Sequence, residues 1–265
     1  MIKDITVGQY IPGKSVLHKA DPRTKILLSL VFMVVTLIVN SYIGLVILSL
    51  FTLLAIVISG TPLGFVLRGI KPIIFVLIFA MLINLFTIQG KTALDLGFVN
   101  ITYEAINVSV KLFLRLMCLF IGLSLLTITS TPIALADGIE KLMSPFKKIG
   151  LPVHEIAMMM TIALRFIPTL IDETDKIMKA QASRGADFDT GNIIQKAKSF
   201  IPVLIPLFVS AFRRADELAV AMEARCYRGS VGRTRMKQLH FKKVDLFISM
   251  FMIVFSTGLL YLEYM

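Results

Sequence analysis

Five long apolar blocks limit what this chain can fold into. They are nearly free of charged residues and cover positions 26–39, 43–59, 73–88, about 112–128 and 246–261. An α-helix of about 20 residues crosses the roughly 30 Å hydrocarbon core of a bilayer. The whole chain is 56% hydrophobic and 17% charged, whereas soluble domains are about a quarter charged. We therefore expect an all-α polytopic membrane protein with about five transmembrane helices.

The basic residues set the expected orientation in the bilayer. The net charge is +11, from 28 Lys and Arg against 17 Asp and Glu. Patches that bind nucleic acid normally lie on a soluble fold, so we expect no nucleic acid and assign this charge to the positive-inside rule and to anionic lipid. The cytoplasmic segments are then 1–25, 68–71 and 131–243. Residues 40–42 and 89–110 and the C-terminus are expected outside.

Residues 131–243 are more polar than the blocks around them. Thr131-Pro132 is expected to open a short helix that ends near Gly150. In two longer stretches, around 156–177 and 193–212, apolar residues recur at helical spacing. Because each apolar core looks too short to span the membrane comfortably, we predict three long amphipathic cytoplasmic helices; the alternative is a soluble three-helix domain. The expected domains are 1–130 with four transmembrane helices, 131–243 with the amphipathic helices, and 244–265 with the last transmembrane helix.

The second and third amphipathic helices are expected to end alike. One finishes with Ser183, Arg184 and Gly185, and the other finishes with Ala224, Arg225 and Cys226. An arginine at a helix C-terminus is favoured by the helix dipole, and glycine suits the position just beyond it, so either end alone fits a simple cap. Two matched ends 41 residues apart favour a second interpretation. A pair of exposed guanidinium groups suits docking into carboxylate-lined grooves of a partner.

The two arginine segments carry a resemblance to a known family. The stretches KKIGLPVHEIAMMMTIALRFIPTLIDETDKIMKAQASRGADF (147–188) and RRADELAVAMEARCYRG (213–229) resemble the transmembrane coupling subunit, or T component, of energy-coupling-factor transporters. The opening YIPGKSVLHKADPRTK (10–25) is similar to the start of the same family. The resemblance covers nearly the whole chain.

The resemblance implies a role without catalysis. It implies a multi-pass subunit of the bacterial cell membrane that links two cytoplasmic ABC-type ATPases to a membrane-embedded substrate-binding subunit, the S component. An S component, dedicated or exchangeable, would select a vitamin or similar micronutrient for uptake. Arg184 and Arg225 would each enter a groove on one ATPase. Cys226 departs from the Gly or Ser usual in the second motif, and Arg228 is kept as a reserve candidate because Arg228-Gly229 repeats Arg184-Gly185.

The stretch GQYIPGKS (8–15) fits the phosphate-binding P-loop pattern letter for letter. A working P-loop follows a buried strand and opens a helix of an α/β domain. Only seven residues precede Gly8, and a transmembrane block follows soon after Ser15. We therefore interpret the match as a coincidence and the stretch as a cytoplasmic turn before the first span.

Other function classes find less support in the sequence. The three histidines are scattered, and no Ser/His/Asp set, carboxylate pair or Cys/His metal spacing occurs, so we predict no enzyme, cofactor or metal site. A secondary transporter would be expected to carry ionisable groups at mid-bilayer and an internal repeat of its spans. That alternative, and a conventional ABC permease with its own substrate pathway, stay open at this point.

Overall fold

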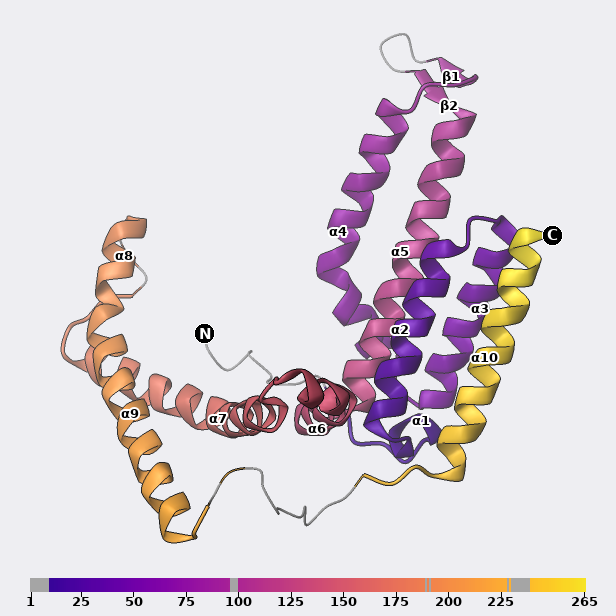
Figure 1. Ribbon diagram of the computed structural model, residues 1–265. Coiled ribbons are helices and arrows are strands. Elements are labelled where there is room, and N and C mark those ends of the chain that lie inside the picture. The colour runs from indigo at the N-terminus through magenta and orange to yellow at the C-terminus, as the bar shows by residue number, and fades with distance from the viewer. Residues whose placement is uncertain (1–9, 96–99, 189, 191, 228, 230–238) are drawn as a thin grey trace. The chain divides into compact units, whose positions relative to one another are not determined.

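The computed structural model describes residues 10–95, 100–188, 190, 192–227, 229 and 239–265 (Figure 1). These residues form helices apart from one small antiparallel hairpin, which agrees with the predicted all-α class. The elements are α1 (Val16–Lys19), α2 (Pro22–Ile38), α3 (Tyr42–Ser59), α4 (Leu63–Thr87), β1 (Thr92–Asp95), β2 (Asn100–Thr102), α5 (Tyr103–Thr129), α6 (Pro132–Met143), η2 (Ser144–Ile149), α7 (Val153–Ser183), α8 (Ile193–Ser199), α9 (Ile201–Ala224) and α10 (Lys243–Tyr264).

The chain divides into two compact units. One unit comprises residues 8–142 and 238–265, and the other comprises 1–7 and 143–237. The helices α1 to α6 and α10 therefore belong to the first unit, which we call the bundle unit. The helices η2, α7, α8 and α9 belong to the second, which we call the arm unit.

Four helices of the bundle unit pack side by side around an apolar core. In Figure 1, α2, α3, α5 and α10 lie next to one another, and α4 packs against α5. Many large apolar side chains on the outer faces of these helices are exposed, as expected where lipid replaces water as the surrounding solvent. The core cluster consists of Phe32, Val35, Val39, Leu45, Leu48, Cys118, Met252 and Leu259.

The predicted hairpin of the first two transmembrane helices is confirmed. Asp21 caps α2 by accepting a hydrogen bond from the Arg23 N–H, and Pro22 occupies the first turn, as the sequence indicates. The turn after α2 is short because Ser41 immediately caps α3 through the Gly44 N–H.

Side chains of two neighbouring helices form hydrogen bonds with the backbone of this short turn. Arg115 of α5 donates to the Val39 carbonyl at 2.7 Å, and Glu263 of α10 accepts from the N–H groups of Asn40 and Ser41 at 3.0 Å each.

The fourth predicted transmembrane helix begins earlier than expected. The polar segment expected at 89–110 contains the β1–β2 hairpin, and α5 already starts at Tyr103 rather than near 112. Thr102 caps α5 through the Ala105 N–H, and Glu104 places negative charge in its first turn. A cap followed by an acidic residue stabilises a helix N-terminus, and this signal was missed.

The number of candidate membrane spans agrees with the prediction, but their identities differ in part. In the described part of the chain, the helices able to cross a membrane by length and apolarity are Tyr42–Ser59, Tyr103–Thr129, Val153–Ser183, Ile194–Ala224 and Lys243–Tyr264, with α4 as a bent sixth. By length and apolarity alone, the second and third amphipathic helices are therefore also long enough to cross a membrane, which the sequence interpretation did not expect. The helix α2, which the sequence predicted as the first transmembrane helix, is not in this set. It has 17 residues, whereas α3, the shortest helix in the set, has 18.

The arm unit contains the two long predicted amphipathic helices. α7 spans 31 residues. α8 and α9 follow each other directly through Phe200, whose backbone stays in the helical region at φ −80° and ψ −16°, so together they form the predicted third helix. Pro202, which has no N–H to donate, lies just beyond this junction. The short helix predicted from Thr131 is present as α6, the last helix of the bundle unit before the arm unit begins. It is followed by the 3-10 helix η2, which is capped by Gly150 at a φ of 88°.

Candidate functional site

The C-terminal end of α7 places the first predicted arginine at a helix cap. Arg184 is the last residue with near-helical geometry, at φ −91°, and Gly185 follows at φ 89°. The Gly185 N–H donates to the Ala182 carbonyl, and the Ala186 N–H donates back to the Gln181 carbonyl, both at 3.0 Å. This pair of bonds is the Schellman motif, which needs a left-handed residue where Gly185 stands.

The C-terminal end of α9 has the same geometry. Arg225 is the cap at φ −92°, and Cys226 follows in the left-handed region at φ 56°. The Cys226 N–H donates to the Glu223 carbonyl at 2.8 Å, and the Tyr227 N–H donates to the Met222 carbonyl at 3.0 Å. The two helix ends thus match bond for bond at an offset of 41 residues.

The match in backbone geometry makes Arg225 the structural equivalent of Arg184. Arg225 holds the same cap position as Arg184, and Cys226 holds the position of Gly185. The reserve candidate Arg228 lies outside the described residues. Within the described residues, Cys226 is the one residue other than glycine with a positive φ, so its departure from glycine carries a backbone cost.

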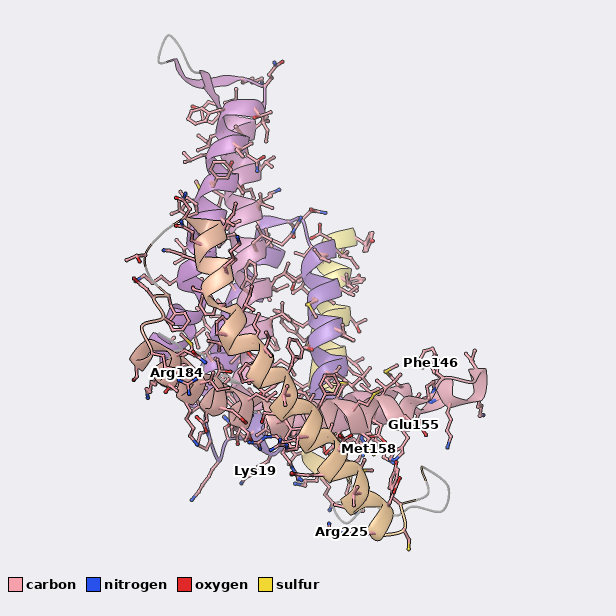
Figure 2. All side chains as sticks on the ribbon, turned by 90° about the vertical axis from the view of Figure 1, so that its left-hand side faces the viewer. Lys19, Phe146, Glu155, Met158, Arg184 and Arg225 are labelled. Carbon is pink, nitrogen blue, oxygen red and sulfur yellow. The ribbon has the colours of Figure 1, made fainter. Side chains whose placement is uncertain are left out.

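Both guanidinium groups are available to a partner. Ser183, Arg184 and Gly185 are exposed, as are Ala224, Arg225 and Cys226. Among the residues that the structure describes, neither arginine forms an ion pair. Figure 2 shows the two labelled arginines at separate ends of the crossed helices α7 and α9. The six predicted residues therefore form two separate exposed helix tips, not one joint site.

A polar cluster joins α7 to α9 where they cross. Glu173 of α7 accepts hydrogen bonds from the Ser210 hydroxyl at 2.5 Å and from the Arg214 guanidinium at 2.7 Å, one on each carboxylate oxygen. Further along, the Gln181 amide donates to the Pro202 carbonyl at 3.5 Å. Sequence reasoning missed Glu173 and Arg214, although they are separated by the same 41 residues as the two arginines.

Apolar side chains cover much of the exposed surface of α9. The sequence predicted an apolar face on this helix, and the residues that the structure describes leave most of that face uncovered. Its large exposed members include Ile201, Leu204, Ile205, Phe208, Val209 and Phe212, with 45–69% of the surface of each residue accessible. Contiguous apolar surface of this kind marks a contact with lipid or with another protein.

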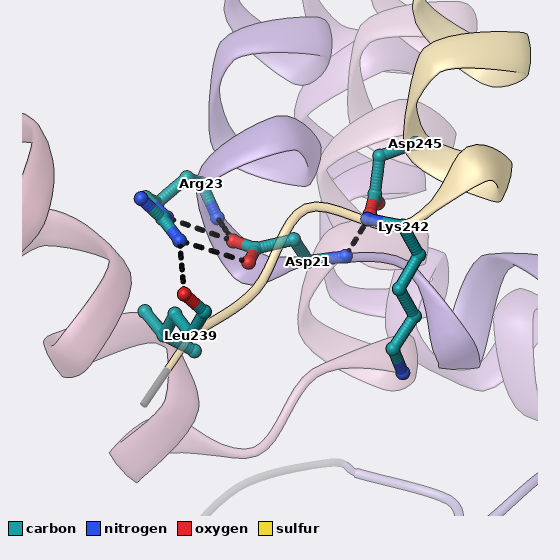
Figure 3. A network of polar contacts seen from close by, with 5 residues as sticks. All are labelled: Asp21, Arg23, Leu239, Lys242 and Asp245. Carbon is teal, nitrogen blue, oxygen red and sulfur yellow. Dashed lines mark hydrogen bonds and ion pairs between the residues drawn. The ribbon is translucent and has the colours of Figure 1, made fainter. Parts of the chain in front are cut away.

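A second polar network, in the bundle unit, joins the start of α2 to the start of α10 (Figure 3). Asp245 is 2% exposed and accepts from the backbone N–H groups of Asp21 and Lys242, each at 2.7 Å. Arg23 forms an ion pair with Asp21 at 3.1 Å and donates to the Leu239 carbonyl at 2.9 Å. The network therefore fixes the chain where it re-enters the bundle after the second arginine tip.

The described part of the P-loop-like stretch has no P-loop geometry. Residues 8 and 9 lie outside the described residues. Ser15 caps the four-residue helix α1, and its hydroxyl contacts the His18 Nδ1 at 2.7 Å. The other ring nitrogen of His18 contacts the Ile11 carbonyl at 3.0 Å, and the Ile11 N–H donates to the Ile128 carbonyl at the end of α5. Residues 10–15 therefore form a turn that leads into α1 just before α2, which agrees with the predicted turn before the first span.

Comparison with known proteins gives consistent similarities. The family model for CbiQ, described as cobalt transport protein, matches residues 13–238. A protein of Ruminiclostridium cellulolyticum is 62% identical over 264 residues, covering 100% of this chain and 99% of its own length. Proteins of Thermosediminibacter oceani, 52% identical over 92% of both chains, and of Bacillus subtilis, 42% identical over 99% of this chain and 100% of its own, are also similar. All three carry the name energy-coupling factor transporter transmembrane protein EcfT.

Proposed function

This chain belongs to the CbiQ family, together with the EcfT transmembrane proteins of energy-coupling-factor transporters, and from that premise we propose that it couples ATP hydrolysis by partner subunits to substrate uptake. In this proposal two cytoplasmic ABC-type ATPases hydrolyse ATP, and a membrane-embedded S component binds the substrate. The chain itself performs no catalysis and transmits the movement of the ATPases to the S component.

The observation that carries the proposal is the pair of identical helix ends. Arg184 and Arg225 cap two long helices with the same backbone geometry, and both guanidinium groups are exposed. Two equal tips at separate places suit two copies, or two similar chains, of one partner. An arginine fork that enters a carboxylate-lined groove forms two parallel hydrogen bonds, which fix orientation as well as position.

The length and stiffness of the helices suit the transmission of movement. Closure of two ATPases around nucleotide displaces any helix tip that is held in their grooves. An α-helix of 24 residues, such as α9, is about 36 Å long and transfers a displacement at one end to contacts along its whole length. The exposed apolar face of α9 is the surface that we assign to the S component and the surrounding lipid.

The remaining assignments rest on the resemblance and on charge. We place the N-terminus and residues 131–243 in the cytoplasm of a bacterial cell, and we keep 1–130, 131–243 and 244–265 as the functional division. The family model is described by cobalt transport and the relatives by an energy-coupling factor. We infer that an exchangeable S component binds to this chain and selects a vitamin or similar micronutrient.

Charge reversal at the helix tips tests this proposal. The full chain is expressed with its cognate ATPases and S component, and the complex is purified through a tag on this chain. Arg184→Glu and Arg225→Glu are expected to insert into the membrane normally and to lose the ATPases, because an acidic groove repels a carboxylate. Arg213→Glu, an exposed arginine of α9 away from the tip, is the matched control. Retention of both ATPases by both tip variants would refute the docking role.

A further inference from the structure

The contact between Glu173 and Arg214 lies at equivalent points of the two arms. Glu173 precedes Arg184 by 11 residues, and Arg214 precedes Arg225 by the same 11 residues. Eleven residues are about three helical turns and about 16 Å, so each member of the ion pair lies on the same helix face as its own tip arginine. The ion pair therefore joins two arms of equal length at one crossing point.

The direction of the helices places the two tips on opposite sides of this contact. Glu173 meets Ser210 and Arg214, whereas Gln181, two turns later in α7, meets Pro202, which lies earlier in α9. The two helices consequently run in opposite senses past each other. Figure 2 shows Arg184 and Arg225 on opposite sides of the crossing. Each tip thus lies about 16 Å along its own helix axis from the contact.

We propose that Glu173, with Ser210 and Arg214, is the fulcrum of the two arms. We call these three residues the clasp. The clasp holds one register between α7 and α9, so that a push on one tip is transmitted to the other instead of being lost as sliding. This inference rests on the proposed function, since it assumes that partners act on both tips, and it assigns positioning residues for that function.

The chemistry of the clasp suits a fulcrum better than apolar packing does. Apolar contacts are not directional, and side chains of similar size allow two helices to slide by small steps. In the clasp both carboxylate oxygens of Glu173 are bonded to α9, and charge-assisted bonds of this kind restrict geometry. Glu173 is 23% and Arg214 37% exposed. A half-exposed ion pair adds little net stability, so its value lies in fixing the crossing.

The test measures the distance between the arms in the complete complex. Spin labels at Lys179→Cys and Val220→Cys, exposed positions with the same 41-residue offset, report the spacing in a chain whose own cysteines are replaced by Ser at 118 and Gly at 226. The labelled chain is purified with its ATPases and S component in lipid nanodiscs. Distances are recorded without nucleotide and with ATP plus vanadate.

The parent complex is expected to show one narrow distance that shifts when nucleotide is trapped. Glu173→Ala and Arg214→Ala are expected to retain both ATPases but to lose the narrow distance and the shift. The exchanged pair Glu173→Arg with Arg214→Glu is expected to restore both. Asp172→Ala and Arg213→Ala, exposed neighbours with the same charges, are the controls.

The outcomes separate this inference from the proposed function. Clasp variants with the same narrow, shifting distance as the parent would overturn the fulcrum while leaving ATPase docking intact. A broad distance in the exchanged pair would also overturn it. A parent chain that recruits no ATPase would instead refute the proposed function itself.

Discussion

Arg184 and Arg225 occupy the same cap position of two Schellman-type helix ends, although glycine follows one and cysteine follows the other. At both ends the two residues after the arginine bond back to the last turn of their helix with equivalent partners. The backbone therefore presents the two guanidinium groups in the same way. Cys226 holds its left-handed conformation at some cost in stability, which glycine at the same position of α7 avoids.

Cys226→Gly is expected to strengthen the end of α9. The left-handed conformation costs a residue with a Cβ about 1–2 kcal/mol in conformational free energy, and it costs glycine almost nothing. Slower amide hydrogen exchange at residues 222–227 in the full chain, with unchanged exchange in α7, is the expected measurement.

Gly185→Ala is the reciprocal control, expected to weaken the end of α7 by about 1 kcal/mol. A Cβ at this position meets nothing within 4 Å, so its cost is that of the backbone alone. Equal exchange in the parent and both variants would show that the φ values of the two ends do not matter.

Arg184→Lys is expected to weaken ATPase binding without abolishing it. Lysine keeps the positive charge and loses the planar fork, so one of two parallel bonds to a carboxylate disappears, at a cost of about 1–2 kcal/mol or roughly tenfold in affinity. The dissociation rate of the detergent-solubilised complex measures this change. A dissociation rate like that of the parent would mean that the groove recognises the positive charge of residue 184 and not the bidentate hydrogen bonds of arginine.

Much of the fold follows from short-range sequence signals. The hairpin of α2 and α3 was predicted because Asp21-Pro22 and the uncharged 40–42 turn act within a few residues. The two arginine tips were predicted because each ends an amphipathic repeat. The apolar spacing continues across the junction of α8 and α9 at Phe200, and Pro202 is the local sequence signal that marks this junction.

The contacts between distant segments could not be predicted from one sequence. Asp245 meets the Asp21 N–H across 224 positions, and Glu173 meets Arg214 across 41. Such pairs depend on the direction in which whole helices pack, and no local propensity encodes that direction. The 41-residue offset between the two arginines is a sequence signal for the second of these contacts, because adding 41 to the number of Glu173 leads to Arg214.

Asp245→Asn is expected to destabilise the bundle unit. Both carboxylate oxygens accept backbone N–H groups, and an amide turns one of these acceptors into a donor that faces another donor. A buried donor left without a partner costs about 1–3 kcal/mol. Thermal unfolding of the full chain in detergent measures the loss, with the exposed Asp216→Asn as the control. Identical unfolding temperatures for the two variants would contradict the assigned role of the network.

Gly122→Ala and Gly258→Ala are expected to act in opposite directions on the same bundle. A Cβ at Gly122 of α5 would lie 2.5 Å from the Phe32 ring, whereas one at Gly258 of α10 meets nothing within 4 Å. Overpacking costs about 1–3 kcal/mol, and alanine within a helix gains about 0.5–1 kcal/mol over glycine. An apolar cavity of about 140 Å³ lined by Phe32 and Gly122 gives the ring room to move, so the Gly122→Ala loss should fall near the lower limit.

The double variant Gly122→Ala with Phe32→Leu identifies the cause of that loss. Leucine removes the ring edge that the new methyl group meets, so the cost of the Gly122→Ala change should be smaller in the Phe32→Leu background than in the parent. Unfolding temperatures of the four chains in one detergent give this coupling directly. If the alanine costs the same in both backgrounds, the close approach of α5 to Phe32 is not what requires glycine at position 122.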